Sequence, residues 1–249
     1  MKHIIILLFL SVNFSCISTK DNLVVLQYYS NDTLNINNKT EVFSSTLNIG
    51  YLNDLTVYEI PIANFGEFKL DSASGSYNAS DKAIDTTYLY YVSKKDDSKG
   101  ILYNAVASKA VMTYSKDSLI RALNFDEESM RIFSVKLPKP VETLKNKLGK
   151  IEVEKFDSKI LETDADTIYR YFNDKLKKVD FTFSKNLDKE KDSKLSKTTF
   201  IYLKDNKPNS QPRIISHTGI RKIEARNPKE LTQLFGRFTE DSKLFNLNE

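Results

Sequence analysis

The chain has 249 residues, of which 40% are hydrophobic and 28% are charged, a composition ordinary for one large globular domain or two small ones. The formal net charge of +4 is spread over interleaved lysines and acidic residues, whereas a nucleic-acid-binding protein gathers its basic residues on one side. A single cysteine excludes an intramolecular disulfide, so a hydrophobic core has to stabilise the fold alone.

The first sixteen residues, MKHIIILLFLSVNFSC, have the layout of an export signal. Lys2 gives a positive start, Ile4–Leu10 is an unbroken apolar run, and the small Ser15 comes directly before Cys16. The apolar run is too short for a membrane-spanning helix, which needs about 20 residues. The segment therefore predicts export; a buried N-terminal core helix is the alternative, and Lys2 argues against it.

Cys16 lies just after the apolar run and is the only cysteine. This arrangement resembles that of bacterial lipoprotein precursors, which are cut before a cysteine that then carries the lipid. The resemblance covers residues 1–16, with Asn13 in the place where these signals usually have leucine. It implies a lipid anchor on Cys16 and, because Ile17 replaces the aspartate of inner-membrane retention, the outer membrane of the cell envelope. Ordinary secretion after cleavage near Ser18, giving a periplasmic or secreted protein, is the alternative.

Residues 23–137 predict a β-rich N-terminal half. β-branched and aromatic residues alternate with polar residues between short polar turns, a pattern typical of antiparallel strands. The expected strands are Leu23–Tyr29, Glu41–Ile49, Leu55–Ile62, Thr86–Val92, Ile101–Ala107, Ala110–Tyr114 and Ser118–Leu123. We expect turns at Ser30–Asp32 and Asn53–Asp54 and a loop at Asp71–Asp81. For Asp117–Leu123, a helix is the alternative to a strand.

Residues 138–149 predict a connecting helix between two halves. Pro138 and Pro140 mark a boundary, and Val141, Leu144 and Leu148 follow at helical spacing. Together with the preceding segments this divides the chain into a signal (1–15), a tether (16–22), the N-terminal half (23–137), the connecting helix (138–149) and a β-rich C-terminal half with a terminal helix (150–249).

The C-terminal half also predicts strands. The expected strands are Thr167–Phe172, Leu176–Phe183, Thr198–Leu203 and two edge strands, Arg213–Ser216 and Gly219–Ala225. An amphipathic helix from Ile168 to Lys175 is the alternative for the first. The charged run Asn186–Lys197 predicts a solvated loop, and the last helix begins at Asn227, the expected cap, and continues to Phe238.

These elements predict an α+β fold, mainly antiparallel β-sheet with a few short helices. The pattern allows both one continuous curved sheet and two smaller β modules.

Sequence motifs for catalysis are few. His217 is the one histidine outside the signal segment, and we interpret it as a turn or edge-strand residue rather than a catalytic base. Glu162, Asp164 and Asp166 have the oxygen ligands that Ca²⁺ prefers, but an acidic turn is the stronger interpretation. No Gly-x-Ser-x-Gly elbow or glycine-rich phosphate loop occurs. The sequence therefore predicts no catalytic residue, no metal site and no cofactor.

Tyr88, Tyr90 and Tyr91 form an aromatic cluster. On a strand, Tyr88 and Tyr90 share one face and Tyr91 takes the other. The shared face could line a pocket for an apolar or sugar ligand, with core packing plus a solvated face as the alternative.

The sequence thus favours a non-enzymatic envelope lipoprotein that binds a ligand or an envelope protein and is held at the membrane by Cys16. A carboxylate-based envelope hydrolase and a structural or assembly subunit of an envelope complex remain the alternatives.

Overall fold

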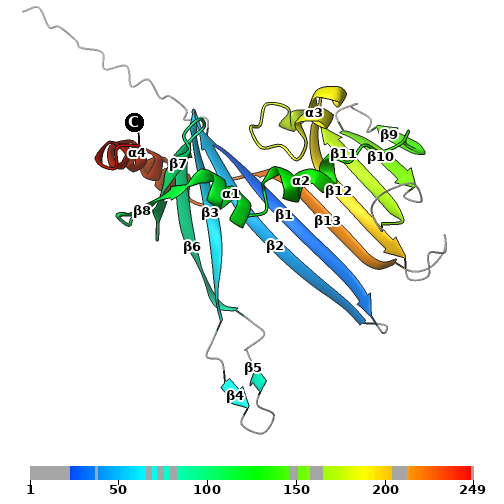
Figure 1. Ribbon diagram of the computed structural model, residues 1–249, viewed down its shortest axis with the longest axis horizontal. Coiled ribbons are helices and arrows are strands. Elements are labelled where there is room, and N and C mark those ends of the chain that lie inside the picture. The colour runs from blue at the N-terminus through cyan, green and yellow to red at the C-terminus, as the bar shows by residue number, and fades with distance from the viewer. Residues whose placement is uncertain are drawn as a thin grey trace, which may run out of the picture.

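A computed structural model describes residues 23–36, 39–65, 69–71, 76–78, 83–145, 151–157, 165–203 and 212–247. The signal segment, Cys16 and the tether lie outside these ranges. Among the described residues, the dominant feature is one antiparallel sheet of eleven strands, with four α-helices packed on it (Figure 1). The sheet-dominated antiparallel architecture predicted from the sequence is confirmed.

The strand order across the sheet is β8-β7-β6-β3-β2-β1-β13-β12-β11-β10-β9. The strands are β1 (Val24–Ile36), β2 (Lys39–Leu52), β3 (Leu55–Phe65), β6 (Ala83–Lys94), β7 (Lys99–Tyr103), β8 (Ala110–Ser115), β9 (Glu142–Lys145), β10 (Ile151–Asp157), β11 (Thr167–Asn173), β12 (Lys194–Leu203) and β13 (Pro212–Ile223). A separate two-stranded ribbon, β4 (Lys69–Asp71) with β5 (Ser76–Asn78), lies between β3 and β6.

Two meanders build the sheet. The chain runs from β1 through β2, β3, β6 and β7 to one edge at β8, crosses to the other edge at β9, and returns through β10, β11 and β12 to β13. The crossing contains α1 (Lys116–Ala122) and α2 (Glu127–Ser134), which lie over the sheet in Figure 1. Because β13 pairs with β1, the two halves form one sheet rather than two β modules.

The two faces of the sheet bury different clusters, since side chains alternate along each strand. On the face that we call the α1–α2 face, Leu26 and Ile49 pack in clusters that include Leu119 of α1 and Phe133 of α2. The face that we call the α4 face buries Val25, Val57 and Val92 against α4 (Pro228–Leu244), which contributes the fully buried Leu234, Phe235 and Phe238.

Several predicted elements are confirmed. The Asn53–Asp54 turn joins β2 to β3, with Asn53 at φ 56°, a conformation that asparagine tolerates. The predicted pairing of Thr86–Val92 with the strand at Ile101 is present as β6 and β7. The strand Thr167–Phe172 corresponds to β11, so the alternative helix over this segment is wrong. The C-terminal helix begins at Pro228 as expected, although Asn227 makes no side-chain capping hydrogen bond.

The connecting helix predicted over residues 138–149 is wrong. Glu142–Lys145 forms the edge strand β9, whose residues pair with β10 from Lys155 back to Glu152. The apolar residues that suggested a helix do not face a core, because Val141 is 63% exposed and Leu144 is 58% exposed. The backbone instead gains hydrogen bonds from a sheet edge that the local sequence does not reveal. Leu148 and Gly149 lie outside the described residues.

The strand predicted over Leu176–Phe183 is also wrong. A short 3-10 helix, η2 (Asp174–Leu176), is followed by irregular backbone that leads to α3 (Lys185–Lys191). Phe181 and Phe183, which a strand would place on one face, instead belong to irregular backbone. Phe181 and Phe183 contact each other with ring centroids 5.2 Å apart, in a cluster beside Tyr28 and Phe125.

Several other predicted elements also differ from the structure. The predicted Ser30–Asp32 turn is strand, paired on both sides with β2 and β13. The predicted strand Ser118–Leu123 is the helix α1, capped by Ser115 and buried through Leu119. The predicted charged loop Asn186–Lys197 contains most of α3 and the start of β12, and the predicted loop Asp71–Asp81 contains β5. The two predicted edge strands, Arg213–Ser216 and Gly219–Ala225, are one strand, β13, which lies between β1 and β12.

Candidate ligand-binding pocket

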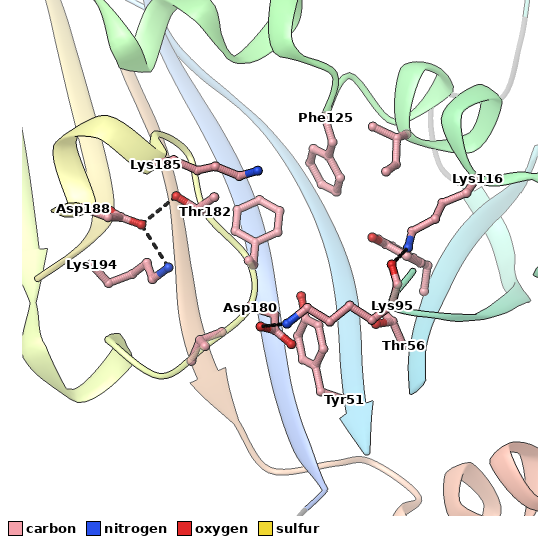
Figure 2. A pocket seen from close by; sticks show the side chains of 14 residues that line it. Tyr51, Thr56, Lys95, Lys116, Phe125, Asp180, Thr182, Lys185, Asp188 and Lys194 are labelled. Carbon is pink, nitrogen blue, oxygen red and sulfur yellow. Dashed lines mark hydrogen bonds and ion pairs between the residues drawn. The ribbon is translucent and has the colours of Figure 1, made fainter. Parts of the chain in front are cut away.

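A pocket of about 560 Å³ lies on the α1–α2 face (Figure 2), within the size range of small-molecule sites. It is an open depression bordered by the sheet, the segment that joins α1 to α2, the β6–β7 turn and the irregular segment before α3. Its lining consists of aromatic and aliphatic residues (Tyr51, Tyr58, Ile120, Phe125, Val179, Phe181), four lysines (Lys95, Lys116, Lys185, Lys194), two aspartates (Asp180, Asp188) and two threonines (Thr56, Thr182).

Aromatic rings form its apolar part. Phe125 and Phe181 pack edge to face with centroids 5.3 Å apart, and Tyr51 and Tyr58 project from β2 and β3. Burial raises the pKa of the Tyr58 phenol to about 12, and burial together with the nearby Tyr58 and Asp180 raises the pKa of Tyr51. Both tyrosines are therefore neutral at physiological pH and contribute apolar area with a hydroxyl group.

The lysines and aspartates make the pocket positive, with four cationic groups against two anionic groups. Two of the lysines form ion pairs with the two aspartates. Lys95 Nζ lies 3.0 Å from Asp180 Oδ1, and both side chains are at least half exposed, so water weakens this pair. Lys194 Nζ lies 2.9 Å from Asp188 Oδ2 and is largely buried.

Asp188 has a structural role at the pocket wall. Besides the Lys194 ion pair, its Oδ2 accepts a hydrogen bond of 2.6 Å from Thr182 Oγ1, and its Oδ1 accepts one of 2.8 Å from the backbone N–H of Leu195. These contacts join α3 to the start of β12. The Asp188–Lys194 ion pair thus stabilises the pocket wall, and a ligand could bind without breaking this ion pair.

Lys116 is positioned by backbone carbonyls. Its ammonium group donates hydrogen bonds to the carbonyl oxygens of Lys94, at 3.1 Å, and Lys95. Burial lowers its pKa, while Asp96 and Asp97 act in the opposite direction. The ammonium group therefore has fixed partners that carry no full negative charge.

Lys185, at the start of α3, differs from the other three lysines. It is exposed, and within the described part of the chain it has neither an ion pair nor a hydrogen bond through its ammonium group. Figure 2 shows its side chain reaching across the mouth of the pocket toward Phe125. An anion in the pocket could therefore bind Lys185 without displacing an existing partner.

The pocket chemistry supports binding. Rings and aliphatic groups can contact an apolar body, while Lys116 and Lys185 can bind an anionic head group. None of the fourteen lining residues is a histidine, cysteine or serine, the residues that most often serve as general bases and nucleophiles.

The candidate residues from the sequence do not meet in this pocket. His217 lies within the sheet on β13, where its Nδ1 is 2.9 Å from Thr199 Oγ1 and burial lowers its pKa. Asp166 accepts a hydrogen bond of 2.7 Å from the backbone N–H of Leu203. Glu162 and Asp164 lie outside the described residues, as Cys16 does. Among the residues that are described, no group of three His, Cys, Asp or Glu side chains has the geometry to hold a metal ion.

The tyrosine cluster is divided by the sheet as its spacing predicts. Tyr91 is fully buried on the α1–α2 face, where its hydroxyl donates to the carbonyl oxygen of Tyr114 at 3.3 Å. Tyr88 and Tyr90 are half-buried on the α4 face and line a second hollow there.

Sequence reasoning missed the pocket residues. Asp188 and Lys194 belong to the charged run Asn186–Lys197, which was predicted to be a solvated loop, and Lys185 comes directly before that run. Lys95 lies between the predicted strands Thr86–Val92 and Ile101–Ala107. The closest signal was the apolar pair Phe181 and Phe183 directly before a charged run, because such aromatic residues need a packing partner. Phe125, the partner of Phe181, is over fifty positions away along the chain and cannot be identified from local pattern.

A scan of the chain against protein-family models gives no match, and no curated protein matches it. Helix α4 has 17 residues with charged groups throughout, and no helix of the described ranges has the length and apolar character to cross a membrane.

Proposed function

We propose that this chain is a cell-envelope lipoprotein, anchored through Cys16, whose α+β domain binds an amphipathic anion in the pocket on the α1–α2 face. It acts as a binding module rather than as an enzyme. The observation that carries the proposal is the juxtaposition in one pocket of buried and half-buried aromatic rings and an excess of lysines. One of these, Lys185, has no ion pair with any residue that the structure describes.

The energetics favour an amphipathic ligand over a small inorganic anion. Contact with the rings removes apolar ligand surface from water, which contributes about 25 cal/mol per Å² buried. An exposed ammonium group alone contributes little, because water and salt screen it. Affinity therefore comes mainly from the apolar body, and the lysines select its charge.

The test uses two fluorescent probes that share an aromatic frame. 1-Anilinonaphthalene-8-sulfonate is anionic, and N-phenyl-1-naphthylamine is its uncharged relative. We expect the anionic probe to bind saturably and more tightly than the neutral one. Lys185→Glu should weaken the anionic probe by about tenfold or more, corresponding to about 1.4 kcal/mol, and should leave the neutral probe nearly unchanged.

Lys189→Glu is the matched control, because Lys189 is an exposed lysine on the same helix and does not line the pocket. It should change neither affinity by more than about twofold. Both variants need a cooperative unfolding transition, since the anionic probe also binds partly folded states. Equal binding of both probes, with no effect of Lys185→Glu, would contradict an anion site.

The anchor has a separate test in cells that express wild type and Cys16→Ala. We expect a lipid-sized mass increase on a mature N-terminus at Cys16, and membrane association that the variant loses. A soluble wild-type protein with an N-terminus beyond Cys16 would refute the anchor and leave a secreted or periplasmic binding protein. Turnover of a substrate that depends on a single carboxylate would instead favour a hydrolase, and fixed-ratio co-purification with an envelope protein would favour an assembly subunit.

A further inference from the structure

A second hollow lies on the α4 face of the sheet, on the opposite side from the lysine-lined pocket. It consists of two adjoining depressions of about 290 Å³ and 470 Å³, which share Tyr88, Tyr90, Val106 and Glu230. We call it the α4 cleft. Its floor is strand β6 with Glu59 of β3, and its walls are the first turn of α4 and the loop after β7.

Side-chain hydrogen bonds hold the walls of the α4 cleft together. Arg237 of α4 donates to the carbonyl oxygens of Val106, at 2.7 Å, and Ser108, at 2.5 Å, both in the loop after β7. Tyr103 at the end of β7 donates to Asp241 of α4 at 3.1 Å. The cleft is therefore formed before any ligand arrives, which lowers the entropic cost of binding.

Glu59 is the fixed charge at the floor. The residue is 9% exposed, and its Oε2 accepts a hydrogen bond of 2.8 Å from Asn48 Nδ2. Asn48 Oδ1 in turn accepts from Gln27 Nε2 at 3.3 Å, and Gln27 Oε1 accepts from Arg221 Nε at 3.0 Å. This series of side chains crosses β13, β1, β2 and β3, and we call it the amide relay.

The amide relay orients Glu59 without neutralising it. Within the described residues Glu59 has no ion pair, and Oε1 has no hydrogen-bond partner. Oε1 is not a fully buried atom, so it faces the open space of the cleft, where a cation can pair with it. Glu230 adds a second carboxylate to the cleft and Arg226 adds one guanidinium, so the lining carries one net negative charge.

Tyr88 and Tyr90 complete the cleft with two aromatic rings. Elsewhere on the same face three tyrosines already have a cation over the ring, namely Arg221 on Tyr29 at 5.6 Å, Lys197 on Tyr171 at 4.8 Å and Lys155 on Tyr169 at 6.0 Å. In the part of the chain that the structure describes, no cation lies over Tyr88 or Tyr90 in this way. Rings beside a carboxylate form a favourable site for an ammonium group.

We propose that the α4 cleft binds an organic ammonium cation, with Glu59 and Glu230 as the anionic groups and the Tyr88 and Tyr90 rings as the contact surface. A monovalent cation would neutralise the net charge of the lining. Burial raises the pKa of the Tyr90 phenol, and Glu59 and Glu230 raise it further, so this ring remains a neutral contact beside the two carboxylates.

The test measures binding of choline to the full-length chain by calorimetry and by saturation-transfer NMR. The control probe is 3,3-dimethyl-1-butanol, which replaces the nitrogen of choline by carbon and has no charge, and methyl glucoside tests for a saccharide site. We expect saturable choline binding in the millimolar range, at least tenfold tighter than binding of the neutral isostere, and no measurable binding of the glucoside.

Two variants remove one charge each without changing shape. Glu230→Gln lies on the exposed first turn of α4 and should weaken choline binding severalfold. Glu59→Gln should abolish it, provided that the variant unfolds cooperatively like wild type; otherwise Glu230→Gln decides. Glu240→Gln, another exposed glutamate on α4 that lies outside the cleft, is the matched control and should bind choline as wild type does.

Three results would overturn the proposal. Equal affinity for choline and its neutral isostere would show an apolar cleft. Glucoside binding with no choline binding would show a saccharide cleft, and loss of choline binding in Glu240→Gln as strongly as in Glu230→Gln would show a diffuse charge effect. The outcome is independent of the anionic probe, because the two sites lie on opposite faces.

Discussion

The two faces of the sheet carry sites of opposite charge. The pocket on the α1–α2 face has four lysines and two aspartates, whereas the α4 cleft has two glutamates and one arginine. Consecutive residues of β3 contribute to both, because Tyr58 lines the pocket and Glu59 lines the cleft. The alternation of side chains along a strand is sufficient to keep the two charge distributions apart.

The sites also differ in what holds their charged groups. In the pocket, Lys95 and Lys185 belong to a turn and to the first turn of a short helix, and they are exposed. In the cleft, Glu59 belongs to a central strand and is fixed by the amide relay. The comparison indicates an adaptable cationic site on one face and a preorganised anionic site on the other.

The largest expected effect comes from the packing that builds the α4 cleft. Leu234 of α4 is fully buried, so Leu234→Ala should lower the free energy of unfolding by about 2–5 kcal/mol, through lost burial and the cavity left behind. Urea denaturation measures the loss. Glu240→Ala, an exposed position on the same helix, should stay within about 0.5 kcal/mol of wild type. A loss below about 1 kcal/mol for Leu234→Ala would mean that α4 does not hold this face together.

An intermediate effect tests the buried phenol on the α1–α2 face. The pKa of the Tyr58 phenol is about 12 in the folded state, above the ordinary 10.0. The neutral phenol therefore contributes fully to the stability of the fold below pH 10, and this contribution is lost as the pH rises toward 12. Wild type should therefore lose on the order of 2 kcal/mol more than Tyr58→Phe between pH 9 and pH 12. Denaturant unfolding at both pH values measures this difference. Parallel pH curves for the two proteins would show that the Tyr58 hydroxyl is not kept from ionising.

The smallest expected effect tests whether the two sites bind their ligands independently. Gln27→Ala interrupts the amide relay between Arg221 and Asn48 and should weaken choline binding by about threefold, the consequence of losing one hydrogen bond that orients Glu59. Binding of the anionic naphthalene probe should not change. If both ligands weaken together, the two faces are coupled and do not act as independent sites.

The local sequence pattern correctly predicted the elements whose structure depends on neighbouring residues. The strands beginning near Leu55, Thr86 and Thr167, the turn at Asn53 and the helix beginning at Pro228 all follow from alternation, turn chemistry or apolar spacing within a few residues. The assignment of Tyr88 and Tyr90 to one face and Tyr91 to the other follows from the same alternation.

Elements that depend on distant partners were not predictable in the same way. Glu142–Lys145 becomes a strand because β10 offers a free edge, and β1 continues past Ser30 because β2 and β13 pair with it on both sides. Both sites are of this kind. Asn48 and Glu59 look like ordinary strand residues until register joins them, and Lys185 looks solvated until the Phe181–Phe125 contact places its helix over the sheet.

The pairing of β1 with β13 has a consequence for folding. The hydroxyls of Ser30 and Thr218 lie 3.4 Å apart although 188 positions separate them in the chain. Contacts of such long range make folding slow, because the closure entropy is lost before the contact is gained. A nascent chain must also leave the edge of β1 unpaired until almost all of the protein is available, and open strand edges aggregate. Until β13 is available, β1 keeps an open edge to which a chaperone could bind.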